Sequence, residues 1–221
     1  MWDSLSAPML ELFATSLWET LVMVGISGIA GSVIGIPLGV LLRLTDRGGV
    51  LEKPGLNRVV GMVVNAVRST PFIILLVAVI PFTRLVVGSS IGTAAAVVPL
   101  TIAAAPFIAR LVETALREVD RGLIEAAQAM GATTSQIVFK VLLPESLPGV
   151  VAGLTITFVS LVGYSAMAGA IGGGGLGDLG IRYGYQRFLP EVMLTVVVIL
   201  IVFVQLVQSF GDWLVRRLSH K

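Results

Sequence analysis

The sequence predicts an all-α integral membrane protein with five transmembrane helices. Of its 221 residues, 56% are hydrophobic and only 13% are charged, with a mean hydropathy of +0.96. These values lie outside the range of soluble globular domains. Several apolar runs reach the roughly 20 residues that a helix needs to cross a bilayer. A single domain, 1–221, is expected, with spans at about 17–42, 59–80, 88–109, 149–171 and 192–211.

The segment before the first span contains no Lys or Arg within its 19 residues, so it lacks the basic start of a cleavable signal peptide. Its apolar side chains include Leu5, Leu12 and Phe13, with Trp2 and Trp18 among them. Such a segment suits an amphipathic helix on the outer membrane interface. A disordered tail is the alternative.

The first span carries glycines at Gly31, Gly35 and Gly39, the small-xxx-small spacing that lets two helix backbones approach closely. Packing within the chain is favoured over a dimer contact. Four prolines lie within spans, and each removes a backbone donor, so those helices should kink or break. The prolines are Pro37, Pro71, Pro99 and Pro106.

The second span contains Arg68, the one ionisable side chain placed within the hydrocarbon. A charge at that depth is costly, by about 2.5–3.5 kcal/mol on insertion scales, and should face protein or water. Arg68 could then line a pore, act as a gate or pair with a substrate carboxylate. If the span starts nearer Ser69, Arg68 instead extends to the inner interface.

The distribution of Lys and Arg predicts the orientation, because short cytoplasmic loops carry the excess of positive charge. With the N-terminus outside and the C-terminus inside, eleven basic residues fall on the inner side and three on the outer, and Arg68 completes the 15. The inner residues are Arg43, Arg47, Lys53, Arg58, Arg110, Arg117, Arg121, Lys140, Arg216, Arg217 and Lys221. The outer ones are Arg84, Arg182 and Arg187.

The longest extramembrane segment is the loop at about 110–148, and its residue pattern predicts two short helices. Arg121, Glu125 and Gln128 share one face of the first, whereas the apolar residues Leu123, Ala126, Ala127 and Met130 form the other. Gly131 suits a left-handed cap. Thr133 and Gln136 have capping-box spacing, and Pro144 is expected to end the second helix.

A DNA-binding helix-turn-helix is an alternative for this loop. Its second helix would need side chains that reach bases and phosphates. It offers only Ser135, Gln136 and Lys140, with no basic cluster to supply electrostatic affinity. Nucleic acid is therefore not an expected partner.

The fourth span is followed by a glycine run and interrupted by Tyr164, Ser165 and Met167. Met is flexible and polarisable, so Met167 could close a narrow opening or could simply fill the core. The run from Gly172 to Gly177 contains Gly-x-Gly-x-x-Gly, but no βαβ context for a dinucleotide site. The sequence has no P-loop and no cysteine, so ATP must bind elsewhere and Cys metal sites are excluded.

The last span is expected to be anchored by Trp213 at the inner interface. His220 is the only histidine. It has no evident partners for a metal or catalytic role, and a solvated position is expected.

The loop motif Glu125-Ala126-Ala127-x3-Gly131-x9-Val141-x-Leu143-Pro144 resembles the signature of permease subunits of bacterial ABC importers. Val141 replaces the usual Ile. The resemblance implies a type I importer permease fold, in which Glu125 to Gly131 forms a coupling helix that docks on a cytoplasmic ATPase. Leu143-Pro144 would fix the return into the next span.

Further segments resemble the methionine-uptake branch of that family. They are Arg68 to Phe72, Ile80 to Arg84, Ala105 to Arg110 and Val162 to Gly169. The resemblance implies a homodimer in the bacterial inner membrane, two ABC ATPases that bind ATP and Mg, and a periplasmic or lipoprotein binding protein that delivers D- or L-methionine. Arg68, Tyr164, Ser165 and Met167 are the pore and gate candidates, and this chain itself would not be an enzyme.

Three other functions stay open at this point. The first is an ABC permease for another amino acid or small solute. The second is a self-sufficient channel or secondary transporter, which is disfavoured because no Asp or Glu lies in the middle of a predicted span. The third is a membrane-anchored DNA-binding regulator.

Overall fold

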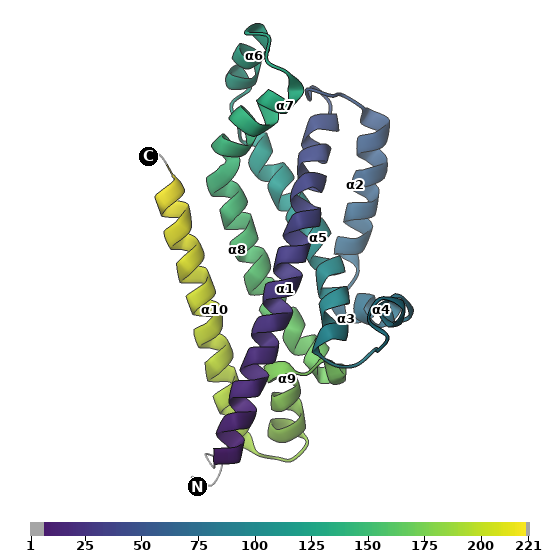
Figure 1. Cartoon of the computed structure of the whole chain (residues 1–221), viewed down its shortest axis with the longest axis vertical. Helices are drawn as coiled ribbons and strands as arrows, with labels where there is room; N and C mark the ends of the chain where they lie inside the picture. Colours follow the sequence, from purple (N-terminus) through teal and green to yellow (C-terminus); the bar gives the residue numbers. More distant parts are fainter. Residues whose placement is uncertain (1–6, 220–221) are drawn as a thin grey trace.

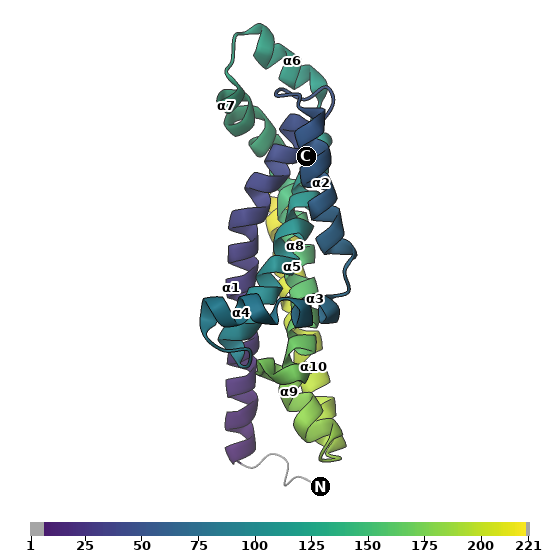
Figure 2. The same cartoon turned by 90° about the vertical axis from the view of Figure 1, so that its right-hand side faces the viewer.

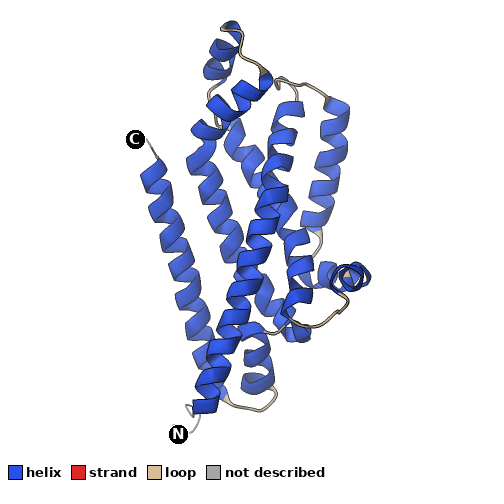
Figure 3. Cartoon of the chain, viewed as in Figure 1, coloured by secondary structure: helices blue, strands red, loops and turns tan. Residues whose placement is uncertain are grey.

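The computed structural model describes residues 7–219 as helices joined by short loops, with no strand among them (Figures 1 and 3). Long helices run along the longest axis, α6 and α7 form one end, and α9 and the start of α1 form the other (Figure 1). The elements are α1 (Ala7–Thr45), α2 (Pro54–Ser69), α3 (Phe72–Ala78), α4 (Ile80–Val87), α5 (Thr93–Arg117), α6 (Arg121–Ala129), α7 (Thr134–Ile137), the π-helical η2 (Val138–Leu142), α8 (Leu143–Ala168), η3 (Gly169–Gly173), α9 (Gly175–Leu179), η4 (Gly180–Tyr185) and α10 (Pro190–Leu218).

Four helices are long and apolar enough to cross a membrane, and α2 with α3 makes a fifth span if the bent pair is counted as one. The four are α1, α5, the helical stretch Thr134–Gly173 and α10. This all-helical architecture confirms the predicted fold class.

The second span, predicted as one segment at 59–80, is broken. The axes of α2 and α3 differ by 105°. Pro71 lacks an N–H and disfavours a helical conformation for the residue before it. Thr70 is accordingly extended, with φ −79° and ψ 125°. The chain then continues into α4, which lies across the long axis (Figure 2).

The other three intramembrane prolines do not interrupt their helices. α1 continues through Pro37, and α5 continues through Pro99 and Pro106. The expectation was a kink or a break; no break occurs at these positions, and the kink stays a prediction. A proline removes one backbone hydrogen bond from the helix. Tight packing of α1 against α5 on both sides of these residues keeps the remaining turns in place.

The segment before the first span is neither an interfacial helix nor a tail over its described part. α1 begins at Ala7 and runs without interruption into the span. Near its start, the Glu19 carboxylate accepts a hydrogen bond from Gly175 N–H (2.6 Å), and Thr20 Oγ1 accepts one from Leu176 N–H (2.9 Å). These contacts tie α1 to α9. Trp2, Leu5 and His220 lie outside the described residues.

α1 and α5 pack closely against each other. An added Cβ on Gly35 would lie 2.5 Å from the Ala105 carbonyl oxygen, and one on Gly39 would lie 2.5 Å from that of Ala109. The glycine spacing therefore serves packing within the chain, as predicted. We call this interface, with Gly31, the α1–α5 seam.

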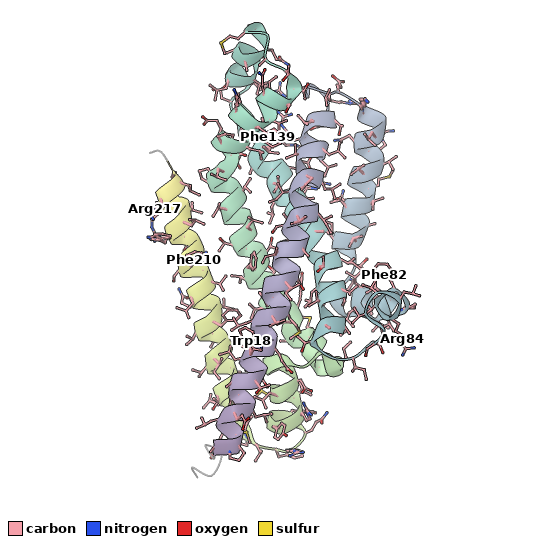
Figure 4. The ribbon with its side chains drawn as sticks, viewed as in Figure 1. Trp18, Phe82, Arg84, Phe139, Phe210 and Arg217 are labelled. Atoms are coloured by element: carbon pink, nitrogen blue, oxygen red, sulfur yellow. The ribbon has the colours of Figure 1, made fainter. Side chains whose placement is uncertain are left out.

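α10 packs against α8 and η4 along one side, and leaves much of its apolar surface uncovered. Phe210 and Arg217 project from this helix, and Trp18 projects from α1 (Figure 4). The Arg217 guanidinium lies 5.2 Å from the Trp213 ring centroid, an arrangement typical of a helix end at a membrane interface.

Candidate functional site: the α6–α7 element and the interior cavities

α6 is closed at both ends by local hydrogen bonds. At its start, the Asp120 carboxylate accepts from Gly122 N–H (2.7 Å). At its end, Gly131 N–H donates to Gln128 O and Ala132 N–H donates to Ala127 O, the pair of bonds that defines a Schellman motif. Gly131 has a φ of +77°, so the predicted left-handed cap is confirmed.

α7 begins with the predicted capping box. Thr133 Oγ1 accepts from Gln136 N–H (3.3 Å), and Gln136 Oε1 accepts from Thr133 N–H (2.8 Å). Both orphan donors at this helix start are thereby satisfied.

Pro144 does not end the second helix, contrary to the prediction. Helical backbone runs from Thr134 past Pro144 to Ala170, with a π-helical turn at Val138–Leu142 just before the proline, and the first non-helical dihedrals come at Ile171 and Gly172. Leu143 N–H donates to Val138 O, five residues back. The wider turn accommodates a proline in the second position of α8 without a break. α7 is thus continuous with α8.

The apolar residues of α6 do not all face the protein body. Ile124 and Ala127 are buried, whereas Leu123 is 44% exposed and Met130 is 81% exposed. Phe139, 68% exposed, lies at the same end of the molecule (Figure 4). The predicted apolar face contained Ala127, Leu123 and Met130 but not Ile124. The spacing of three residues from Ile124 to Ala127 places both on one side of the helix and indicates the buried stripe.

The coupling-motif residues differ in exposure. Glu125, Ala126, Gly131 and Pro144 are exposed, and Val141 and Leu143 are half-buried. Glu125 borders a cavity between α6 and the turn after α1. The motif therefore presents its first half at the surface and packs its second half into the start of α8.

A buried carboxylate joins the ends of α1, α2 and α5. Glu113 is 1% exposed and pairs with both Arg110 and Arg117, each at 2.6 Å. Arg110 also donates to Asn65 Oδ1 (2.8 Å), and Arg117 pairs with Asp46 (2.9 Å). This cluster was not predicted, because residues 110–148 were expected to form a loop, whereas α5 continues to Arg117. The i, i+3 and i, i+4 spacing of the three residues was the available signal.

Two of the four pore candidates line one cavity. Arg68 and Tyr164 border a space of about 100 Å³ beside the break between α2 and α3. The Arg68 guanidinium lies 5.6 Å from the Phe107 ring centroid, and the Tyr164 ring stacks on Phe72 at 4.7 Å. A cation and three aromatic rings thus meet where the second span is broken.

The other two candidates lie elsewhere. Ser165 is buried, and its hydroxyl donates to Val162 O within its own helix (2.8 Å). Met167 borders a different, apolar cavity of about 420 Å³ between α8, α9 and α10. Consecutive residues on a helix point about 100° apart, so a sequence run of four cannot line a single space.

Comparison with known proteins identifies the family. Residues 35–220 match the family described as "Binding-protein-dependent transport system inner membrane component". The chain belongs to this family. It is therefore a multi-pass inner-membrane component of a transport system, and the matched range contains every coupling and pore candidate named above.

Family members with assigned names are close in sequence. The chain is 58% identical over 211 residues to the "Probable D-methionine transport system permease protein MetI" of Vibrio cholerae, covering 96% of this chain and 94% of that protein. It is 59% identical over 165 residues to the "D-methionine transport system permease protein MetI" of Escherichia coli K12, covering 75% and 76%.

Two solved structures share the fold. A chain of the MetNI methionine ABC transporter, in an inward-facing conformation, has a TM-score of 0.96 at 56% identity, covering 98% of this chain and 100% of that one. A chain of an amino acid ABC transporter crystallised with histidines has a TM-score of 0.78 at 20% identity. The second likeness concerns the fold alone.

Proposed function

We propose that this family member is the membrane-spanning permease subunit of an ATP-driven importer for D- and L-methionine. The observation that carries the proposal is the 58% identity, over 96% of the chain, to a protein named as a D-methionine permease. The match to a methionine ABC transporter chain at a TM-score of 0.96 supports the same substrate.

The proposed assembly is a homodimer with its pore at or near the subunit interface, two cytoplasmic ABC ATPases and an external binding protein. ATP and Mg bind to the ATPases, because this sequence carries no P-loop, and the permease has no active site of its own. The exposed side chains Leu123, Met130 and Phe139 offer the ATPase an apolar docking surface around the coupling motif.

The proposed orientation places the α6–α7 end in the cytoplasm and the start of α1 in the periplasm. Basic residues of the turn after α1, of α6 and of the last turn of α10 lie toward one end of the molecule (Figure 1). Such a bias is typical of the cytoplasmic side.

The proposed mechanism uses the helix that runs from Thr134 to the end of α8 at Ala168 as a lever. When ATP draws the two ATPases together, α6 and α7 move with them. Because no break separates α7 from α8, this displacement passes directly into the fourth span. The α1–α5 seam moves as one body, and the pore opens alternately to the two sides.

Within the pore, Arg68 and Tyr164 are proposed to contact the transported solute. Ser165 is assigned to packing of the fourth span, and Met167 to the gate. Replacing Met167 with Ala should raise ATP hydrolysis in the absence of the binding protein. Unchanged hydrolysis together with unchanged uptake would remove Met167 from the gate.

An uptake experiment tests the proposal. The permease is reconstituted in vesicles with its ATPase and binding protein, and radiolabelled L-methionine, D-methionine and a panel of other amino acids are supplied. We expect methionine accumulation with ATP and none with ADP. Accumulation of a different amino acid alone would replace the substrate while keeping the mechanism. Flux through the permease without ATPase would instead indicate a self-sufficient channel or transporter.

A further inference from the structure

A polar cavity lies behind the coupling helix. It occupies about 120 Å³ between the polar face of α6 and the turn that follows α1. Arg121, Glu125 and Gln128 contribute from α6, and the turn at Gly48 and Gly49 closes the opposite side. A liquid water takes up about 30 Å³, so the cavity has room for an ion of a few heavy atoms.

Arg43, at the end of α1, lines this cavity with most of its donors unused. The residue is 8% exposed, and the one hydrogen bond that its side chain makes within the described residues runs from Nε–H to Leu116 O (3.3 Å). An arginine carries five N–H donors, so four remain. No fully buried side-chain nitrogen lacks a partner among residues 7–219, so the terminal nitrogens of Arg43 are in contact with solvent, and the residue lines this cavity.

The charges around the cavity are unbalanced. Arg121 forms no ion pair within the described residues, and neither does Glu125, although the two lie four residues apart on one face. The neighbouring Asp46 and Glu113 are engaged by Arg117. Both carboxylates also attract Arg43 without bonding to it, and Glu52 accepts a hydrogen bond from Gly48 N–H (3.2 Å) on the opposite side. Arg43 and Arg121 therefore lack a bonded carboxylate, and Glu125 is the one carboxylate among the residues that line the cavity.

We propose that this cavity is a binding site for a small oxyanion, a carboxylate or a phosphate group. Arg43 and Arg121 hold the anion through charge-assisted hydrogen bonds, a geometry for which the guanidinium fork is suited. Glu125 borders the same space and weakens binding by like-charge repulsion. The anion bridges the end of α1 to α6, so its presence fixes the coupling helix on the membrane body.

The chemistry admits two sources of this anion. One is an acidic side chain of the docked ATPase subunit, and the other is a free cytoplasmic anion such as phosphate. In either case the anion is bound by the buried Arg43 and the exposed Arg121.

Sulfate serves as the probe for the full-length, detergent-purified chain. The unfolding temperature is measured as sodium sulfate replaces sodium chloride at constant ionic strength. A bound anion gives a saturable rise, whereas general salting-out gives a gradual rise in every variant. Losing a charged hydrogen-bond donor weakens binding by about tenfold or more.

Four variants test whether the cavity residues cause the sulfate effect, because each has a different expected result. Arg43→Gln and Arg121→Gln should each abolish the saturable rise, and Glu125→Gln should lower the sulfate concentration that half-saturates it. Arg47→Gln is the matched control, since Arg47 lies on the same turn but does not line the cavity. If Arg43→Gln does not fold, the variant at the exposed Arg121, Arg121→Gln, still tests whether the cavity binds sulfate. A saturable rise that survives in Arg121→Gln, or no rise in the wild type, would overturn the site.

The assembled complex separates the two sources. If the ATPase supplies the acidic group, binding of the ATPase should remove the sulfate effect, and Arg43→Gln should weaken assembly. If the anion is free, the sulfate effect should persist in the complex and alter its rate of ATP hydrolysis. These readouts do not involve methionine, so failure of the substrate assignment would leave them unchanged.

Discussion

Glycine serves opposite purposes in the α1–α5 seam and in the α6–α7 element. In the seam, Gly35 and Gly39 have ordinary helical dihedrals, but no space for a side chain. In the α6–α7 element, Gly131 has open space on all sides, but a φ of +77° that other residues rarely adopt. One region depends on contact between distant segments, and the other on the conformation of a single residue.

This difference indicates that the two regions are stabilised in different ways. The seam depends on side chains and backbone of two long helices, so it should fail as a unit. The α6–α7 element satisfies its own backbone groups through Asp120, Gly131 and the Thr133–Gln136 capping box. It can therefore keep its shape while it moves with a partner. The buried Glu113 cluster lies between the two regions.

The largest expected effect is from Gly35→Leu in the seam. The first added carbon would already lie 2.5 Å from the Ala105 carbonyl oxygen and 2.8 Å from Ile108 Cβ. The two helices must separate, so the loss of stability should exceed the about 1–3 kcal/mol of ordinary overpacking. Expression level and the unfolding temperature in detergent measure the effect.

Gly25→Leu on the same helix is the matched control for that variant. An added Cβ at Gly25 has no neighbour within 4 Å, so its unfolding temperature should stay close to that of the wild type. Equal destabilisation by both variants would show that helix flexibility, rather than close approach at the seam, explains the glycines.

An intermediate effect is expected from Glu113→Gln at the junction. The neutral side chain leaves Arg110 and Arg117 without their shared carboxylate. Breaking a buried pair costs about 3–5 kcal/mol, but these arginines are 25% and 51% exposed, so a loss of about 2 kcal/mol is expected. The exposed Glu118→Gln is the control. If both variants unfold at the same temperature as the wild type, the cluster contributes nothing to holding α1 and α2 on α5.

Local signals in the sequence were sufficient for several features. Apolar runs predicted the membrane helices, and the spacing of Thr133 and Gln136 predicted the capping box. Gly131 was placed correctly as a helix cap. Each of these depends on residues within one or two turns of chain, where backbone geometry and composition decide the structure.

Features that depend on distant contacts were missed. The segment after Ala7 is helical in part because Glu19 and Thr20 bond to the backbone of α9, which is 156 residues away along the chain. The partners of Arg110 and Arg117, which lie on α2 and in the turn after α1, could not be predicted from the α5 sequence alone. Pro144 was misjudged because the π-helical turn that accommodates it has no residue signature of its own.

The four pore candidates do not share one cavity, and this too depends on contacts between distant segments. Tyr164, Ser165 and Met167 were grouped because they are adjacent in sequence, but their side chains point to three different surroundings. Arg68 joins Tyr164 only because the chain breaks at Pro71. A break was predicted there, but its 105° angle depends on how α3 packs against α5 and α8.

The smallest effect on stability, and a specific effect on coupling, is expected from Gly131→Ala. The left-handed conformation costs a residue with a side chain about 1–2 kcal/mol, and the Schellman bonds at Gln128 and Ala127 would weaken. Since this strain is confined to the end of α6, the unfolding temperature should change by a few degrees at most. Methionine uptake per ATP hydrolysed, measured in vesicles with the partner proteins, should fall. Gly131→Asn tolerates the left-handed region better and should recover part of the uptake. Gly55→Ala, in open space in the first turn of α2, should leave the uptake unchanged. Normal coupling in Gly131→Ala would mean that the cap is dispensable, and that the two regions do not differ in the way their glycines suggest.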